Sequence, residues 1–244
     1  MKLLGIDIDG GLGQLVNVPI GHVFPLPESL PLQHAPLVEV YGLGQHVLHR
    51  ARVQPGETVA ILGAGKLGLA VLDVLCHGAG PALTIVADIQ PFRLEIARKV
   101  GADFVIDVTH EDPVERIHEL TRGLGVDCVI ECIGDYRDIP GREAPLAQAV
   151  KIMRNGGRIV TTGLGEQLST VHFKTLVMKE GEIIASRCTL GEFPRAIRLL
   201  EKGLLHPELM ITHRVPLKEI APAFEELDRE AATTIKIIVD VQAS

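Results

Sequence analysis

The 244-residue sequence lacks three features that would point to particular kinds of partner or location. It has no stretch of roughly 18 or more apolar residues, which excludes a membrane-spanning helix. It has no run of lysine or arginine and a formal net charge of -7, which argues against nucleic acid and anionic membranes as partners. Residues 1–13 are acidic and glycine-rich, unlike a secretory signal, so we expect a cytoplasmic protein.

The cysteines also lack a metal-binding pattern. Cys76, Cys128, Cys132 and Cys188 form no C-x-x-C pair, and no two of them have the spacing of a zinc knuckle. Cys128 and Cys132 lie in an apolar, strand-like run, where small buried thiols are common. We therefore interpret the cysteines as core thiols.

What the sequence does contain is a regular alternation of strands and helices from residue 54 onward. Hydrophobic residues make up 46% of the chain, which is enough for a sizeable core. The predicted strands are 58–62, 83–87, 104–106, 127–133, 158–162 and 182–186, and the helices are 66–78, 91–100, 113–121 and 144–154. Apolar strands that are each separated by one helix indicate a parallel sheet covered on both faces, so the fold class is α/β, a doubly wound parallel sheet of about six strands.

The two flanks do not follow this alternation. Residues 1–34 are short extended pieces rich in glycine and proline, and 35–50 is predicted to be a helix. After Gly191 the pattern predicts a helix to Lys202, an extended piece at 210–214, a helix at 217–228 and a final strand at 234–241.

A glycine-rich turn follows the first predicted strand and opens the first helix of the alternation. It reads Gly63-Ala64-Gly65-Lys66-Leu67-Gly68. Gly63 permits the tight turn, Gly65 lets a pyrophosphate approach the backbone, and Gly68 lets the helix pack close to the sheet. The helix N-terminus then offers unpaired N–H groups to phosphates. Asp88 ends the next strand, about 20 residues after Gly68. The order of strand, glycine turn, helix, strand and acidic residue favours a dinucleotide site over ordinary turn glycines.

The acidic residue indicates which dinucleotide binds. Asp88 would accept hydrogen bonds from the adenosine ribose hydroxyls and would repel a 2′-phosphate, so NAD is favoured over NADP. Arg93, on the following helix, could reach the same ribose or could assist a 2′-phosphate, and this leaves NADP as the weaker alternative.

From these residues outward, the chain resembles the zinc-containing medium-chain alcohol dehydrogenase family, closest to its sorbitol and threonine dehydrogenase branch. The segments that carry the resemblance are 10–19, Val38-Glu39, His46-Val47, Gly101-Ala102-Asp103, Gly156-Gly157-Arg158 and 212–217. The resemblance implies a Rossmann NAD-binding domain at 51–187. It also implies that remnants of a catalytic barrel domain flank this domain, with 1–50 as a partial segment and linking helix and 188–244 as the return.

The resemblance implies further site residues at the carboxyl ends of the strands. Gly163 and Leu164, after the fifth strand, would lie beside the nicotinamide, and Cys132 and Ile133 would lie against the adenosine half. Arg187, after the sixth strand, resembles an arginine that faces the cofactor and substrate in the sorbitol branch. A plain surface arginine is the open alternative for Arg187.

The family also implies a catalytic zinc that polarises the alcohol oxygen, and here the sequence departs from the pattern. Glu39 matches the position of a glutamate ligand of the polyol branch, although Val40 replaces the proline that usually follows. The segment that carries the cysteine and histidine ligands is not among the 244 residues. Since a zinc site needs three protein ligands and an open position, we expect an incomplete site with Glu39 as its one candidate ligand.

The histidines do not replace the missing ligands. His46 fits a family helix position near the cofactor domain, and we interpret it as a packing histidine. Histidines in polar or helix-end contexts are interpreted as surface residues: His49, His77, His110, His118 and His206.

Three functions stay open from the sequence. The first is an NAD-dependent oxidoreductase that transfers hydride between a small alcohol or polyol and NAD, with its zinc domain lost or supplied by a separate chain. The second is a non-catalytic NAD(H)-binding module or subunit. The third and least favoured is a zinc-independent quinone or enone reductase. In all three, residues 1–40 and 200–244 should expose apolar surface, so we expect association, as a homodimer or homotetramer.

Overall fold

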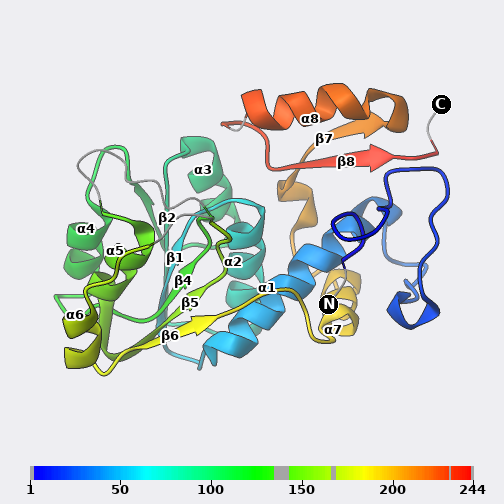
Figure 1. The fold of residues 1–244 in the computed structure, drawn as a ribbon. Helices are drawn as coiled ribbons and strands as arrows, with labels where there is room; N and C mark the ends of the chain where they lie inside the picture. Colours follow the sequence, from blue (N-terminus) through cyan, green and yellow to red (C-terminus); the bar gives the residue numbers. More distant parts are fainter. Residues whose placement is uncertain (1–2, 135–142, 166–168, 231, 243–244) are drawn as a thin grey trace.

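A computed structural model describes residues 3–134, 143–165, 169–230 and 232–242 of the chain. A six-stranded parallel sheet forms its centre (Figure 1). The strands are β1 (Thr58–Leu62), β2 (Leu83–Asp88), β3 (Phe104–Asp107), β4 (Val126–Glu131), β5 (Met153–Thr161) and β6 (Glu182–Ala185). Their spatial order is β3-β2-β1-β4-β5-β6, with every neighbouring pair parallel. The predicted doubly wound sheet is therefore confirmed, and its order reverses between β1 and β4, where such sheets form a crevice for ligands.

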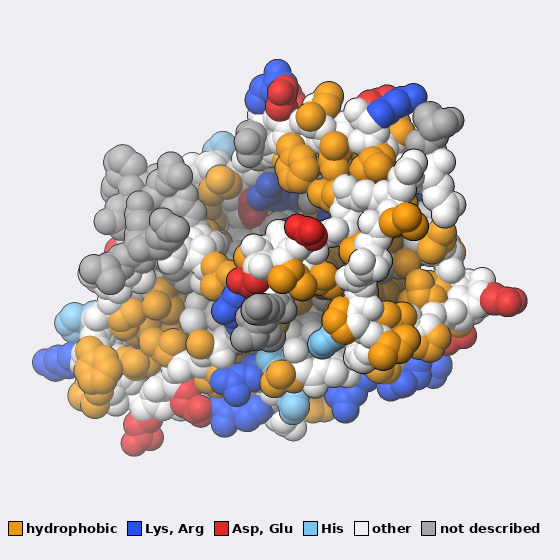
Figure 2. All heavy atoms as spheres, turned by 45° about the vertical axis from the view of Figure 1, so that its right-hand side comes forward, with side chains coloured by type: hydrophobic (Ala, Val, Ile, Leu, Met, Phe, Trp, Pro, Cys, Tyr) orange, Lys and Arg blue, Asp and Glu red, His pale blue; other side chains and the backbone are white. Residues whose placement is uncertain are grey.

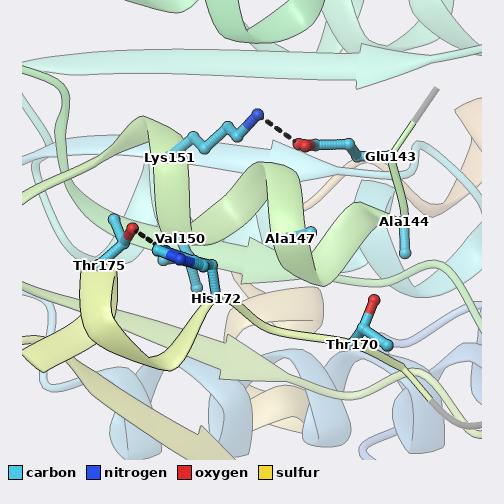
Figure 3. A pocket seen from close by; sticks show the side chains of 8 residues that line it. All are labelled: Glu143, Ala144, Ala147, Val150, Lys151, Thr170, His172 and Thr175. Atoms are coloured by element: carbon cyan, nitrogen blue, oxygen red, sulfur yellow. Dashed lines mark hydrogen bonds and ion pairs between the residues drawn. The ribbon is translucent and has the colours of Figure 1, made fainter.

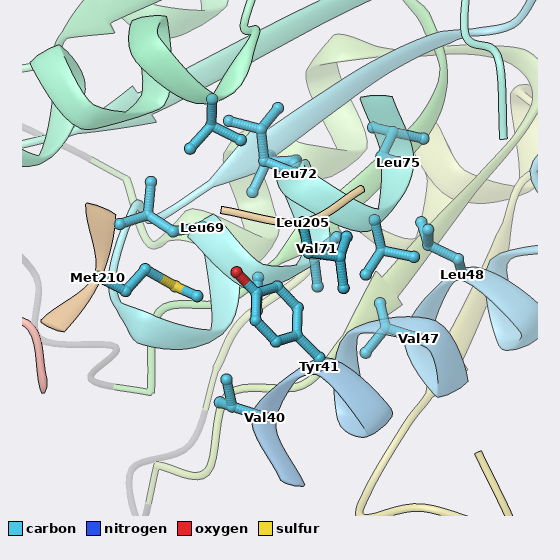
Figure 4. Close-up of a cluster of buried hydrophobic side chains, with 14 of the residues drawn as sticks. Val40, Tyr41, Val47, Leu48, Leu69, Val71, Leu72, Leu75, Leu205 and Met210 are labelled. Atoms are coloured by element: carbon cyan, nitrogen blue, oxygen red, sulfur yellow. The ribbon is translucent and has the colours of Figure 1, made fainter. Parts of the chain in front are cut away.

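Helices cover both faces of this sheet. One face carries α1 (Val38–Ala51), α2 (Lys66–Gly78), α3 (Pro91–Val100) and α7 (Phe193–Glu201), and the other carries α4 (Pro113–Leu120), α5 (Pro145–Ile152) and α6 (Phe173–Met178). In β1, Val59 and Ile61 belong to the first core, while Ala60 and Leu62 belong to the second. This alternation explains why β1 is apolar throughout. Figure 4 shows part of the first core, where Tyr41 of α1 lies among side chains of α2.

The C-terminal part forms a smaller layer beside the main sheet (Figure 1). Strands β7 (Ile211–Pro216) and β8 (Lys236–Asp240) pair in parallel, and α8 (Ile220–Arg229) connects them. Short 3-10 helices complete the flanks: η1 (Ile20–His22), η2 (Leu32–Leu37), η3 (Pro207–Leu209) and η4 (Leu217–Glu219). Many apolar side chains of these flanks are exposed, including Leu15, Ile20 and Phe224, and Figure 2 shows hydrophobic side chains gathered on this side. The expected exposed apolar flanks are thus confirmed.

One boundary in the main sheet differs from the sequence prediction. The helix was expected to continue to Arg154 before a turn at 155–157, but α5 ends at Ile152 and β5 begins at Met153. Gly156, with φ 70°, lies within this strand, and its N–H donates to the carbonyl oxygen of Lys179 at 2.6 Å. The Lys179 ammonium also donates to three carbonyl oxygens at the end of α5. This cap comes from a distant segment, which no local pattern reveals.

Within the described residues, no helix is long and apolar enough to cross a bilayer. All four cysteines are free thiols, and Cys128 is completely buried while the others are partly buried.

A buried arginine joins the linking helix to the sheet. The Arg158 guanidinium on β5 donates to both carboxylate oxygens of Glu57, at 3.0 and 2.5 Å, and to the carbonyl oxygens of Ala51 and Arg52 at the end of α1. The two charged side chains are only 10% and 16% exposed. Burial raises the pKa of Glu57, but the hydrogen bonds from Arg158 and the backbone outweigh it, so the net pKa lies below the ordinary value. This ion pair fixes the end of α1 against the sheet.

Replacing Arg158 by alanine should lower the free energy of unfolding by about 3 kcal/mol, because Glu57 would stay largely buried without its partner. The matched control is Arg98→Ala, which removes an exposed pair with Glu95 and should cost less than about 1 kcal/mol. Urea unfolding followed by circular dichroism measures both. Equal, small losses in the two variants would contradict the role given to Arg158.

The same pair predicts a pH dependence. Because the folded pKa of Glu57 is depressed, its contribution to stability is present above the unfolded pKa of about 4.3 and is lost as the pH falls through the folded value. The gap in stability between wild type and Arg158→Ala should therefore shrink in acid below about pH 4. A gap that stays constant into acid would contradict the pairing.

Candidate functional site

The turn between β1 and α2 depends on Gly63. Its φ of 96° lies in the left-handed region, and its N–H donates to the carbonyl oxygen of Ala87 at 2.7 Å. A Cβ added at Gly63 would lie 2.9 Å from the Cγ1 atom of Ile133. Conformation and crowding therefore both require glycine here.

The two other glycines of the turn have opposite surroundings. At Gly68, an added Cβ would lie 1.8 Å from the carbonyl oxygen of Gly63, so the helix touches the turn directly. At Gly65, no described atom lies within 4 Å of an added Cβ. Lys66 and Leu67 are the first residues of α2, and no described side chain caps that helix. The N–H groups of Lys66, Leu67 and Gly68 donate to no other described residue, which suits a phosphate.

Asp88 fastens this turn to the end of β2. Its side chain is 7% exposed. Its Oδ2 accepts the Ala64 N–H at 2.6 Å, and its Oδ1 accepts the Gln90 N–H at 2.8 Å. A carboxylate has about four lone-pair sites, so Asp88 keeps acceptor capacity for hydroxyl groups of a ligand.

A cavity of about 460 Å³ lies in front of the turn. It is lined by six of the predicted cofactor residues: Gly63, Gly65, Asp88, Arg93, Cys132 and Ile133. Ile89, Val108 and Ile133 supply apolar walls, and Asp88, Arg93 and Glu143 supply charge. An apolar cavity with a few convergent polar groups is the usual form of a nucleotide or small-molecule site.

The strand ends expected to hold the nicotinamide lie next to one another. A Cβ at Gly163 would lie 2.4 Å from the carbonyl oxygen of Ile133, so the turns after β4 and β5 are in contact. Leu164 is 77% exposed, and Arg187, just after β6, is also exposed. Gly163, Leu164 and Arg187 are not among the residues that line the 460 Å³ cavity, and their roles stay predictions.

A second cavity, of about 270 Å³, adds a residue that sequence reasoning missed. Lys66 of α2 and Lys236 of β8 both line it, together with Leu12 and Phe224. Burial lowers the pKa of Lys236, the neighbouring Lys66 lowers it further, and Glu39 acts in the opposite direction. Two ammonium groups therefore lie near the start of α2. Lys236 belongs to no local motif, and only the tertiary fold brings β8 to this helix.

Glu39 does not gather further metal ligands in the part of the chain that the structure describes. It is exposed in the first turn of α1. Two groups of three ligand-type side chains occur among the described residues: His46, His49 and Glu192, and Asp73, His77 and His206. Neither includes Glu39, so these residues do not fit a zinc site there. His46 is 4% exposed and lies 2.9 Å from Glu192, and its role as a packing histidine stays a prediction.

A third cavity, of about 490 Å³, lies between α5 and the segment leading into α6 (Figure 3). Glu143 and Lys151 form an ion pair of 2.7 Å at its rim, and His172 contacts Thr175 at 2.6 Å. None of the predicted site residues lines it. The charged cavity at Gly63 and Asp88 is therefore the better candidate for a cofactor.

The sequence is also similar to those of known proteins. The sequence profile of the family described as zinc-binding dehydrogenase matches residues 67–202. The chain is 30% identical to a sorbitol dehydrogenase of Bacillus subtilis over 95% of its own length and 64% of the relative. It is 32% identical to an L-threonine 3-dehydrogenase of Bacillus velezensis, over 92% of the chain and 63% of the relative. The chain thus spans slightly less than two thirds of these curated relatives.

Solved structures are also similar. A short-chain alcohol dehydrogenase of E. coli, complexed with NADH, matches with a TM-score of 0.89 and 28% identity, over 97% of this chain and 67% of that one. A protein from Sinorhizobium meliloti that is assigned as a zinc-binding dehydrogenase and is bound to NADP matches with a TM-score of 0.85 and 27% identity, over 98% and 68% of the two chains. Of these two similar structures, one is bound to NADH and the other to NADP.

Two of the three glycines of the turn, Gly65 and Gly68, give a sharp test of the site. Gly65→Ala should leave the melting temperature nearly unchanged, because the added Cβ meets open space, but it should weaken NADH binding by at least about tenfold by obstructing the pyrophosphate. Gly68→Ala should instead destabilise the protein, since its Cβ would overlap the Gly63 carbonyl oxygen. Thermal unfolding and NADH titration measure the two effects. Full NADH affinity in Gly65→Ala would contradict the site.

Proposed function

Because the chain belongs to the zinc-binding dehydrogenase family, we propose that it is an NAD-dependent oxidoreductase of the alcohol or polyol dehydrogenase type. The observation that carries the proposal is the open, uncapped N-terminus of α2 at Gly65, with Asp88 fastened beside it. Relatives named sorbitol dehydrogenase and L-threonine 3-dehydrogenase support a small alcohol or polyol as the substrate. The proposed NAD-binding domain is 51–187, with 1–50 and 188–244 belonging to a catalytic domain.

The residues of this chain would bind and orient the cofactor. The first turn of α2 would bind the pyrophosphate through its N–H groups, and Lys66 and Lys236 would add positive charge. The adenosine half would occupy the 460 Å³ cavity, and the other half would extend toward Gly163. When bound, NAD accepts a hydride from the alcohol carbon at its nicotinamide ring. No part of this proposal depends on a zinc ion at Glu39.

The proposed preference for NAD over NADP depends on Asp88. Its nearly buried carboxylate is held by two backbone N–H groups and cannot easily turn away from a 2′-phosphate. Charge repulsion would therefore disfavour NADP. Arg93, on the wall of the same cavity, is the group that would favour NADP if Asp88 were neutral.

Asp88→Asn should remove much of this selectivity. We expect the wild type to bind NADH at least about tenfold more tightly than NADPH, and the variant to bring the two affinities close together. The fluorescence of each nucleotide measures binding, and the chain has no tryptophan to interfere. Asp112→Asn, the same change at the cap of α4, is the control and should leave the ratio unchanged. Equal binding of both nucleotides to the wild type would contradict the NAD assignment.

A second candidate function is a non-catalytic NAD(H)-binding module or subunit. The observation that favours it is that Glu39 belongs to neither group of three ligand-type side chains among the described residues. The test is to incubate the protein with NAD, a panel of small alcohols and polyols, and added zinc, and to follow NADH formation. Alcohol-dependent NADH formation supports the oxidoreductase. NADH binding without turnover supports the binding module, or a subunit that needs a separate chain with the zinc ligands.

We also propose that the chain self-associates, as a homodimer or homotetramer in the cytoplasm. β6 is the last strand of the main sheet among the described residues, and its Ile183 is 39% exposed. Phe173, Val177 and Met178 of the preceding α6 are 70%, 58% and 72% exposed. An edge strand beside exposed apolar side chains favours pairing with a second copy.

Ile183→Lys should shift the protein toward a monomer, because a lysine on an edge strand opposes edge pairing. Leu124→Lys, which changes an exposed apolar residue in the turn after α4, is the control and should keep the wild-type assembly. Light scattering coupled to size-exclusion chromatography gives the mass of each species. A monomeric wild type, or an unchanged assembly in Ile183→Lys, would contradict association through β6.

A further inference from the structure

A buried carboxylate lies on α2, away from the phosphate turn. The Asp73 side chain is 1% exposed. Its Oδ2 accepts hydrogen bonds from the Tyr41 hydroxyl and from the backbone N–H of His206, both at 2.7 Å. Its Oδ1 faces two imidazoles, with the Nδ1 atoms of His206 and His77 at 3.0 and 3.1 Å. The His77 Nδ1 atom also lies 2.9 Å from the backbone carbonyl oxygen of Asp73, a contact that an ion would displace. Asp73 thus joins α1, α2 and the segment that precedes η3.

The surroundings of Asp73 contain little permanent positive charge. Among the ion pairs of the described residues, its partners are the two imidazoles, with no lysine or arginine. Tyr41 contributes a hydroxyl donor and not a cation. Buried carboxylates in proteins are usually paired with a cation or bound to a metal ion, so an added positive charge would suit Asp73.

The three side chains have the geometry of metal ligands. One ligand atom from each of Asp73, His77 and His206 lies within 4.8 Å of the others. Two ligands that are each about 2.1 Å from one ion are separated by about 3.0 Å at a right angle and about 3.4 Å at the tetrahedral angle. The distances of 3.0 and 3.1 Å from the Asp73 Oδ1 to the two Nδ1 atoms fall in this range. These are also hydrogen-bond distances, so an ion would replace the present contacts at spacings that suit its coordination.

The donor set indicates the class of ion. Two imidazole nitrogens and one carboxylate oxygen suit Zn²⁺, Co²⁺ or Ni²⁺, whereas Ca²⁺ and Mg²⁺ prefer oxygen ligands. The His77 and His206 side chains are 31% and 36% exposed, so solvent reaches the cluster and can complete the coordination. The interpretation of these two histidines as plain surface residues was therefore incomplete, since both turn toward a buried acid.

We propose that Asp73, His77 and His206 form a binding site for a divalent transition-metal ion. His77 is one helical turn from Asp73 on α2, whereas His206 is 133 residues from Asp73 along the chain. The ion would fasten the segment leading through η3 to β7 onto the middle of α2. None of the three residues lines a cavity described above, so the site is separate from the proposed nucleotide site.

The test is a titration of the chelator-treated full chain with Co²⁺, followed by visible absorption and by calorimetry. We expect one ion per chain, with the d–d bands of a nitrogen and oxygen site and without thiolate charge-transfer absorption. His77→Gln and His206→Gln, at partly exposed positions that tolerate the change, should each weaken binding by at least about tenfold. His110→Gln is the matched control, because His110 also pairs with an aspartate, Asp107 at 3.0 Å, but without a second histidine.

The ion should also raise the melting temperature of the wild type and of His110→Gln by several degrees, and that of the double variant His77→Gln/His206→Gln by much less. This readout depends on neither nucleotide binding nor activity. Failure of the wild type to bind one equivalent of Co²⁺ would overturn the proposal. Undiminished binding in the double variant, or a spectrum dominated by thiolate ligands, would overturn it as well.

Discussion

The close approach of α2 to the end of β1 is the constraint on which the rest of the structure depends. An added Cβ at Gly68 would lie 1.8 Å from the carbonyl oxygen of Gly63, so only glycine allows the helix to begin there. The approach directs the N–H groups of the first helical turn at the switch point of the sheet, where the strand order reverses between β1 and β4. It also brings the Ala64 N–H to Asp88, which joins the phosphate turn to the residue that would select the ribose.

Segments that precede and follow the main sheet both contact the helix α2. Tyr41 of the linking helix and His206 of the return segment meet on Asp73, in the middle of α2. The return segment continues to β7 and β8, and β8 carries Lys236 back to a cavity shared with Lys66 at the start of α2. The helix α2 therefore contacts the segment before η3 at Asp73 and shares a cavity with β8 at its first turn.

The sequence predicted those features whose cause is local. Strand β1 is apolar at consecutive positions because both of its faces are buried, and this pattern is visible without a structure. Each glycine of the turn has its own physical reason, so the loop and Asp88 could be identified from residue type and spacing. The features that could not be predicted join distant segments: Lys179 caps α5, Lys236 reaches α2, and His206 binds an acid 133 residues away. Their partners are set by the packing of whole elements, which no local pattern encodes.

The most direct test of this account is a crystal structure of the chain grown with NADH. The account predicts the pyrophosphate on the N–H groups of Lys66, Leu67 and Gly68, and the adenosine ribose hydroxyls within hydrogen-bond distance of the Asp88 carboxylate. It also predicts the adenine in the cavity bounded by Ile89 and Ile133. A nucleotide bound elsewhere on the chain, or a fully formed but empty turn at saturating NADH, would contradict the central claim.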